Sequence, residues 1–114
     1  MLSRLFGGGG GGGGAIDVAE AERRAAAGEI ILVDVREKNE WASGHAAKAR
    51  HIPLGSLHAH LPKLAKQGKP VAFVCRSGGR SSNACGQARG AGIEAINVKG
   101  GMIAWQRAGL MIVR

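Results

Sequence analysis

One short stretch of the chain brings together a nucleophilic side chain, two cations and two glycines: Cys75-Arg76-Ser77-Gly78-Gly79-Arg80-Ser81. The apolar run 71–74 precedes it and a segment of helical character follows, so Cys75 stands in a tight loop between a strand and a helix. Backbone N–H groups in such a loop can converge on an anion, and the glycines permit the dihedral angles that this requires. With the helix dipole and the arginine charges, this environment lowers the pKa of a thiol and favours the nucleophilic thiolate.

A buried, inert core thiol is the alternative for Cys75, but the flanking Arg, Ser and Gly residues favour a reactive site. Cys85 lies among Ala84, Gly86 and Ala88, which favours a packing role, with a resolving thiol as the alternative. Two cysteines without C-x-x-C spacing are too few for a metal cluster, so we expect no metal site.

Two chemistries suit a cradled thiolate: phosphate-ester hydrolysis through a phosphocysteine, and sulfur transfer through a persulfide. Cysteine phosphatases have five residues between the cysteine and the arginine, whereas residues 76–79 provide four here. The smaller ring suits a terminal persulfide sulfur better than a phosphoryl group. A phosphatase also requires a general acid, commonly Asp, and no candidate is obvious.

The elements that position this loop alternate between strands and helices. Apolar and β-branched runs predict strands over 30–35, 49–52 and 71–74 and within 93–98. Helices are expected from the Asp17 cap to Ala27, over 37–43, from a Ser56 cap to Gly68, either bent at Pro62 or beginning later, and over 81–91 and 102–108. The tail 110–113 is expected to pack back on the domain. This alternation predicts an α/β fold with a mostly parallel sheet, in which sites lie at the carboxyl ends of strands.

The chain divides into a tail and one domain. Residues 1–14 are expected to form a flexible N-terminal tail whose unbroken glycine run, 7–14, is a linker, and 15–114 the domain. A phosphate-binding glycine loop is the alternative for the run, but no strand precedes it and no Lys-Ser/Thr ending follows.

Composition limits the classes of function. The 114 residues carry 16 Lys and Arg against 8 Asp and Glu, a net charge of +8, which indicates either a generic basic surface or steering of a small anionic substrate. Nucleic-acid binding would rest on charge alone, because no patch of interleaved aromatic and basic residues supports it. With no secretory signal and no long apolar run, we expect a cytoplasmic protein without stable membrane association.

Four stretches together resemble the single-domain rhodanese family of sulfurtransferases over roughly residues 15–114. They are Leu32-Val33-Asp34-Val35-Arg36, the segment from Gly44-His45 to Ile52-Pro53, the loop Cys75–Ser81, and Gly100-Gly101-Met102-Ile103-Ala104-Trp105 with Ala108-Gly109-Leu110. Three positions depart from the family pattern without touching the loop: Lys48, His51 and Met111.

The resemblance implies a rhodanese-like three-layer fold: a central, mostly parallel sheet of about five strands with helices on both faces. It implies that Cys75 takes a sulfur from a donor such as thiosulfate and passes it to cyanide or a thiol, including a protein acceptor. Arg76 and Arg80 would neutralise the anionic donor and leaving group, and the backbone of Arg76, Ser77, Gly78, Gly79 and Arg80 would hold the persulfide. No metal or organic cofactor is needed, and a single domain of this size could work as a monomer.

Two alternatives to turnover remain open: a sulfur-carrier or protein-interaction module that holds a persulfide, and a cysteine phosphatase with an altered loop. Asp34 and Arg36 are interpreted as a structural ion pair rather than as catalytic groups. The four histidines are interpreted as solvated or hydrogen-bonded, and both tryptophans as core anchors: His45, His51, His58, His60, Trp41 and Trp105.

Overall fold

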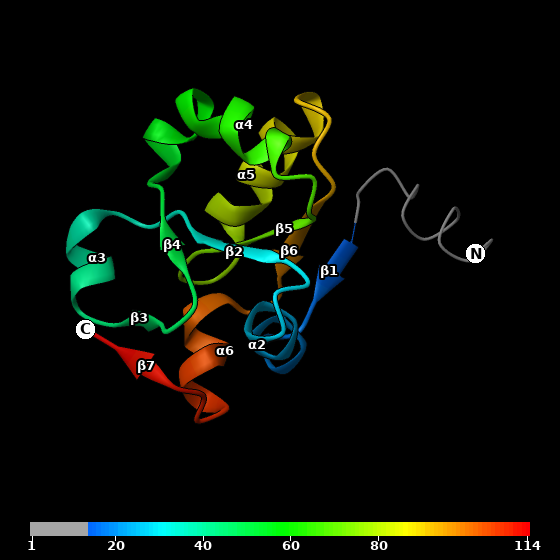
Figure 1. The fold of residues 1–114 in the computed structure, drawn as a ribbon. Coiled ribbons are helices and arrows are strands. Elements are labelled where there is room, and N and C mark those ends of the chain that lie inside the picture. The colour runs from blue at the N-terminus through cyan, green and yellow to red at the C-terminus, as the bar shows by residue number, and fades with distance from the viewer. Residues whose placement is uncertain (1–13) are drawn as a thin grey trace.

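A computed structural model describes residues 14–114, which form a central sheet flanked by helices (Figure 1). The sheet has five strands in the order β1-β6-β5-β2-β4, and every neighbouring pair is parallel. Its strands are β1 (Gly14–Ile16), β2 (Ile31–Asp34), β4 (Arg50–His51), β5 (Val71–Val74) and β6 (Ala95–Val98).

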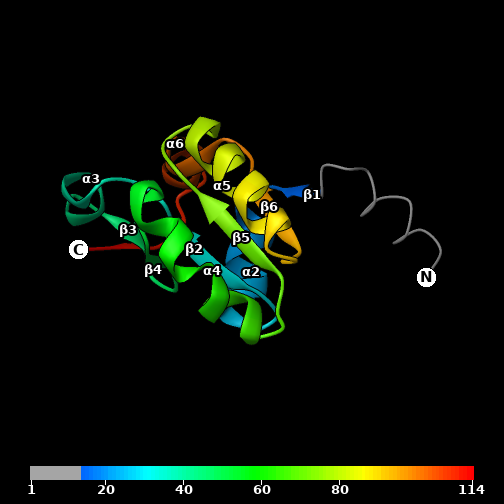
Figure 2. The ribbon, with the colours of Figure 1, turned by 90° about the horizontal axis from the view of Figure 1, so that it is seen from above.

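Helices cover both faces of this sheet, which gives three layers (Figure 2). One face carries α4 (Leu57–Lys66) and α5 (Gly79–Gly90), and the other carries α2 (Val18–Ala26) and α6 (Gly101–Arg107). The short helix α3 (Lys38–Ala42) and the 3-10 turn η1 (Leu54–Ser56) lie in the connections that follow β2 and β4.

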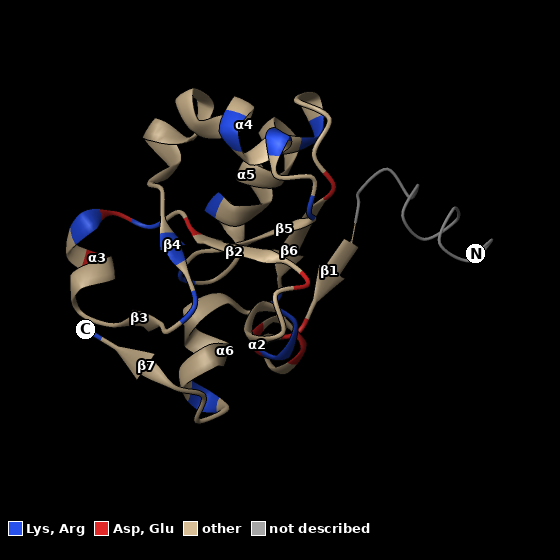
Figure 3. Cartoon of the chain, viewed as in Figure 1, with Lys and Arg blue, Asp and Glu red and all other residues tan. Residues whose placement is uncertain are grey.

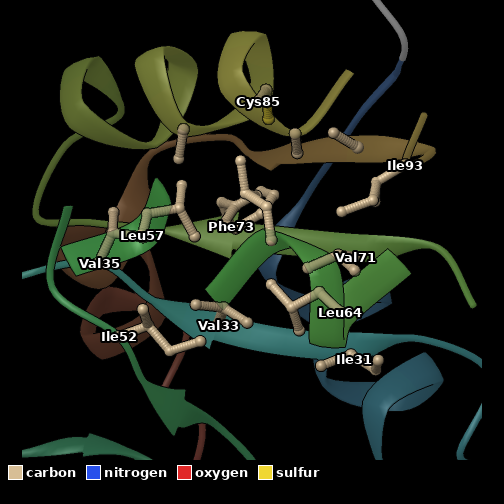
Figure 4. Packing of buried hydrophobic residues seen from close by; sticks show 14 of the residues in the cluster. Ile31, Val33, Val35, Ile52, Leu57, Leu64, Val71, Phe73, Cys85 and Ile93 are labelled. Atoms are coloured by element: carbon tan, nitrogen blue, oxygen red, sulfur yellow. The ribbon is translucent and has the colours of Figure 1, made fainter. Parts of the chain in front are cut away.

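The two central strands divide their side chains between two hydrophobic clusters, as strand alternation requires. Val71 and Phe73 of β5 pack under α4 and α5, whereas Ala72 and Val74 pack toward α2 and α6. Figure 4 shows the first cluster, in which Cys85 of α5 points down onto the strands. A strand buried on both faces explains why β5 is a continuous apolar run rather than an alternating one.

The carboxyl ends of the parallel strands meet at one edge of the sheet. Asp34 is paired with Val74 in the register of β2 and β5, so the residues that follow them emerge side by side. A second, two-stranded antiparallel sheet joins β3 (His45–Ala46) to β7 (Ile112–Val113) and ties down the C-terminal segment. The expected return of the C-terminal tail onto the domain is therefore confirmed.

The fold class and the strands 30–35, 49–52, 71–74 and 93–98 are confirmed, with some ends shorter by one or two residues. One strand was missed and two local expectations are wrong. The strand β1 was not predicted, because three residues next to a glycine run carry no apolar signal of their own. Ser56 makes no side-chain cap, since it lies in the 3-10 turn with helical dihedral angles. Helix α5 begins at Gly79 rather than Ser81.

The predicted tail and glycine linker over 1–14 lie almost wholly outside the described residues, with Gly14 belonging to β1. Among residues 14–114, no helix has the length and apolar character needed to span a membrane. Lys and Arg residues occur on α4, α5 and β4, where the ribbon in Figure 3 is blue in places and nowhere red. The sequence carries no Asp or Glu between Glu40 and Glu94.

Candidate active site

Cys75 follows the last residue of β5, at the carboxyl edge of the sheet, and is fully buried. The loop turns immediately and becomes α5 at Gly79, so the first backbone N–H groups of the helix face back toward the sulfur. The N–H of Gly78 donates to Cys75 Sγ at 3.1 Å, and the N–H of Ser81 donates at 3.3 Å. The loop therefore surrounds the sulfur with backbone donors.

The hydroxyl of Ser81 is hydrogen-bonded to the sulfur, with Oγ 3.3 Å from Sγ. The same oxygen lies 3.1 Å from the carbonyl of Gly78 and 2.6 Å from Asn97 Oδ1 on β6. Ser81 is itself fully buried. The sulfur thus belongs to a hydrogen-bonded group that links the loop, α5 and the neighbouring strand.

Opposing effects set the pKa of Cys75. Burial raises it, since a desolvated thiolate is costly. The Ser81 hydroxyl and the backbone N–H groups of Ser81, Gly78 and Ser77 lower it by a larger total amount, because they favour the charged form. The net pKa of the Cys75 thiol lies below its ordinary value. The loop thus stabilises the nucleophilic form through donors to the sulfur.

Two glycines give the loop its shape. Gly78 has a φ of 130°, a conformation that residues with a side chain rarely adopt. Gly101 has a φ of 58°, and a Cβ at this position would lie 2.4 Å from the carbonyl oxygen of Arg76. This close approach lets the N–H groups of Met102 and Ile103 donate to the carbonyls of Cys75 and Arg76, at 2.8 and 3.1 Å. Helix α6 therefore holds the loop from the opposite side.

The Arg80 side chain is held by a carboxylate from another helix. Its guanidinium makes a bidentate pair with Glu40 of α3, with N···O distances of 2.7 and 3.0 Å. The hydrogen bond from Arg80 is the largest of the effects that lower the pKa of Glu40 to about 2. The structure therefore places Arg80 beside the loop with its charge neutralised, and no hydrogen bond joins it to Cys75 within residues 14–114.

Arg76, by contrast, is exposed, and its side chain makes no hydrogen bond or ion pair with any other described residue. It lines a cavity of about 200 Å³ beside the loop, together with Arg36, Glu40, Ser43, Met102 and Gln106. Of the two loop arginines, Arg76 is the one whose charge is available to a ligand. The exposed Ser77 and Gly79 complete the outer rim of the loop.

Asp34 and Arg36 form a buried ion pair at the end of β2, as the sequence predicts. The Arg36 side chain donates to both carboxylate oxygens, at 2.8 to 3.0 Å, and also to the carbonyl of Gly44 at 2.7 Å. These bonds fix the connection that leads into α3. The pair therefore positions Glu40, and through it Arg80.

The aromatic and imidazole side chains form a stack outside the loop. Trp41 is parallel to His45 and to His51, with ring centroids 3.4 and 4.7 Å away. His45 and His51 are also hydrogen-bonded to backbone carbonyls, those of Trp41 and Arg36. Trp105 is fully buried and is the expected core anchor, but Trp41 is only half-buried and stacks on imidazoles instead. Within the described chain, no three His, Cys, Asp or Glu side chains gather as metal ligands would.

Cys75 lies between a strand and a helix, as predicted, but the contacts that support its loop were not predicted. Glu40, Asn97 and Gly101 come from α3, β6 and α6, far from Cys75 in sequence. The glycine pair at 100–101 was a visible signal, since two glycines before a helix indicate a close approach. No local pattern marks Glu40 or Asn97.

Comparison with known proteins agrees with this geometry. A sequence model described as a rhodanese-like domain matches residues 17–108, and the chain belongs to this family. It is 35% identical over 94 residues to an Allochromatium vinosum protein named "Sulfurtransferase", covering 82% of this chain and 87% of that one. It is also 41% identical over 85 residues to the Bacillus subtilis protein "Putative sulfurtransferase YtwF", covering 75% of this chain and 82% of that protein.

A solved structure of similar fold is the rhodanese-related protein from Thermoplasma volcanium, with a TM-score of 0.71 and 26% identity. The match covers 88% of this chain and 97% of that chain. Other relatives are longer: the chain spans about half the length of the Synechocystis protein slr1261, to which it is 42% identical over 87 residues. Rhodanese-like domains thus occur both alone and as parts of larger proteins.

Proposed function

We propose that this protein is a sulfurtransferase that moves a sulfane sulfur from an anionic donor such as thiosulfate to a nucleophilic acceptor through a persulfide on Cys75. The observation that carries the proposal is the convergence of backbone N–H groups and the Ser81 hydroxyl on a buried sulfur whose pKa is lowered. A thiolate is the attacking species in such chemistry.

The proposed reaction has two displacements. The Cys75 thiolate attacks the outer sulfur of thiosulfate, a new S–S bond forms, and the bond to the sulfonate sulfur breaks so that sulfite leaves with the electron pair. The acceptor, cyanide or a thiolate, then attacks the outer sulfur of the persulfide, and Cys75 leaves as the thiolate. With cyanide the product is thiocyanate, and the protein returns to its starting state.

Charges on the described residues support an anionic donor. Arg76 is exposed at the loop rim and has no ion-pair partner among residues 14–114, so it would meet the sulfonate group first. The N–H groups of Gly78 and Ser81 would hold the terminal sulfur, because a persulfide carries its charge there. Since Cys75 is fully buried, the donor must displace atoms of the loop rim to reach Sγ.

The test is the intact mass of the protein after incubation with thiosulfate. A gain of one sulfur that cyanide reverses is expected for the wild type and for Cys85→Ser, and not for Cys75→Ser. Sulfite should be released on each turnover when cyanide is present. Failure of Cys75 to gain sulfur from any sulfane donor would overturn the proposal.

The same assay separates the alternatives. A persulfide that forms but is not passed on to cyanide or to small thiols would identify a sulfur carrier. Hydrolysis of an aryl phosphate that depends on Cys75 would identify a phosphatase instead. The pairing of Arg80 with Glu40 argues against the phosphatase, because that arginine is not free to bind a phosphoryl group.

A further inference from the structure

The hydrogen bonds around Ser81 contain a constraint that involves Asn97 of β6. Ser81 Oγ lies within hydrogen-bond distance of three atoms that can accept from it: Asn97 Oδ1 at 2.6 Å, the Gly78 carbonyl at 3.1 Å and Cys75 Sγ at 3.3 Å. A serine hydroxyl carries one proton and can donate to only one of them at a time. The position of this proton is therefore linked to the charge on the sulfur.

The observed distances correspond to the thiol form. Two oxygens 2.6 Å apart require a proton between them, so Ser81 donates to Asn97 Oδ1. The thiol S–H of Cys75 can then donate to Ser81 Oγ at 3.3 Å. The chain of donors runs from Cys75 through Ser81 to Asn97, and each acceptor is satisfied.

Ionisation of Cys75 reverses the direction of these hydrogen bonds. A thiolate has no proton to donate and needs donors, so the Ser81 hydroxyl turns toward Sγ. Asn97 Oδ1 would then face a lone pair of Ser81 Oγ at 2.6 Å, which is repulsive. An asparagine can remove this conflict by turning its amide through half a rotation, so that Nδ2 donates to Oγ.

The surroundings of Asn97 permit that rotation. Its side chain lies on the α5 side of the sheet, as does that of Ala95 two residues earlier, and it is partly exposed. Within residues 14–114, Nδ2 makes no hydrogen bond to another protein group, so the amide can turn without breaking one. The backbone of Asn97 is fixed between β1 and β5, in register with Ala15 and Phe73.

We propose that Asn97 is a positioning residue for Cys75: its amide accepts from Ser81 while the sulfur is a thiol, and it turns over to donate to Ser81 when the sulfur is a thiolate. The inference rests on the proposed function only in taking Cys75 as the reacting atom. In the described part of the chain no hydrogen bond joins Asn97 to the sulfur, and Asn97 acts through Ser81.

Other charged groups near Cys75 do not take part in this exchange. They are Arg76 in the loop, Arg80 of α5 with Glu40 of α3, and the Asp34–Arg36 pair at the end of β2. In the described part of the chain, no hydrogen bond or ion pair joins any of them to Ser81 or Asn97. Their effect on the thiol is through space and is unchanged when the amide turns.

The experiment titrates the Cys75 thiolate by its absorbance at 240 nm in a Cys85→Ser background, where it is the only thiol. Asn97→Asp keeps the shape of the side chain but can only accept, so it holds the Ser81 proton away from the sulfur. We expect the pKa of Cys75 to rise and persulfide formation at pH 7 to slow by about ten-fold or more, as for loss of a hydrogen bond to a charged group. Asn97→Leu can neither accept from Ser81 nor donate to it, and we expect a smaller rise in the pKa of Cys75.

A double-mutant cycle separates this mechanism from simple charge repulsion. In Ser81→Ala, Asn97→Asp should raise the pKa of Cys75 by less than half as much as when Ser81 is present. An equal rise with and without Ser81 would overturn the proposal, because it would show that the new carboxylate acts directly on the sulfur. No rise in either background would also overturn it.

A measurement on unmodified Asn97 keeps the proposal testable if its variants fold poorly. The side-chain amide ¹⁵N signal of Asn97, followed by NMR in Cys85→Ser, should change with pH along the titration curve of Cys75. The change should be absent in Cys75→Ser. An amide signal that does not follow the titration of the Cys75 thiol would contradict the proposed rotation of the Asn97 amide. The thiol titrations and the NMR signal do not require sulfur transfer, so the inference can fail while the proposed function stands, and the reverse.

Discussion

Cys75 and Cys85 are equally buried, at 0% and 1% exposure, and belong to the same hydrophobic cluster, yet their acidities move in opposite directions. Burial raises the pKa of Cys85, and the charge of Arg89 offsets this only in part, so the thiol is less acidic than usual. Burial also raises the pKa of Cys75, but hydrogen bonds to its sulfur outweigh the effect.

The difference lies in the backbone around each sulfur. Cys85 lies in the middle of α5, where the N–H groups are bonded within the helix and none is free to reach a side chain. Cys75 lies just before the same helix, where the first N–H groups have no partner in the helix. One helix therefore carries a thiol of raised pKa in its interior and has a thiol of lowered pKa just before its start.

The largest expected effect comes from removing the support of the loop. Gly101→Ala places a Cβ against the carbonyl of Arg76, so the loop must shift and the donors to Cys75 move away from the sulfur. We expect a loss of sulfur transfer on the order of 100-fold and a decrease of about 2 kcal/mol in the free energy of unfolding. Cyanide-dependent turnover measures the loss of sulfur transfer, and denaturant unfolding measures the loss of stability.

The matched control is Gly109→Ala. Gly109 also has a positive φ, 71°, but a Cβ there meets no atom within 4 Å. We expect this variant to lose about 1 kcal/mol of stability while keeping its turnover. Equal losses of turnover in the two variants would show that general strain, not the loop contact, is responsible.

A smaller effect is expected from Ser81→Ala, which removes the hydroxyl near the sulfur and keeps the backbone N–H. The pKa of Cys75 should rise toward that of Cys85, because the remaining donors compensate less for burial. Persulfide formation at pH 7 should slow about ten-fold, as for loss of a hydrogen bond to a charged group. Ser82→Ala changes the exposed next residue and should leave the pKa of Cys75 and the rate of persulfide formation unchanged. A change of either quantity in this variant would contradict the explanation.

Glu40→Gln should widen the difference between the pKa of Cys75 and that of Cys85. It leaves Arg80 unpaired, and the freed charge lowers the pKa of Cys75 by an amount that decreases as salt is added. Thiol titration at low and high salt measures this, and Glu94→Gln, which removes one exposed negative charge elsewhere, is the control. An unchanged thiol would show that the charge of Arg80 does not reach the sulfur.

Replacing the Glu40 carboxylate should also change how the stability of the fold depends on pH. The pKa of Glu40 is lowered from about 4.5 to about 2, so its ion pair stabilises the fold above the ordinary carboxyl pKa. The contribution is lost as the pH falls through the lowered value. The stability difference between the wild type and Glu40→Gln should therefore shrink between pH 4.5 and pH 2, as measured by urea unfolding.

The smallest effect is expected at Cys85. In a Cys75→Ser background, Cys85→Ala should lower the free energy of unfolding at pH 7 by roughly 1 kcal/mol, because it leaves a small cavity. Cys85 stays protonated in the folded state after the unfolded chain has begun to ionise, so its contribution falls as the pH rises through the ordinary thiol pKa. The stability difference should shrink toward pH 10, and a constant difference would contradict the raised pKa.

Much of the site could be read from the sequence because it is local. The residues from Cys75 to Ser81 are contiguous, and a strand, a glycine turn and a helix start must bring their N–H groups together. The apolar runs of β2 and β5 likewise required a sheet buried on both faces, which predicts the α/β class. What the sequence determined by itself was therefore the position of Cys75, its backbone cradle and the edge of the sheet where both lie.

Only the tertiary structure decided which side chains complete that cradle. Glu40 removes the charge of Arg80, Gly101 brings α6 against the loop, and Asn97 meets Ser81 from β6. Each of these contacts joins residues 16 to 40 positions apart or depends on the packing of a separate helix. A sequence pattern records local spacing, whereas such contacts depend on strand order and register, and these place distant residues around one sulfur.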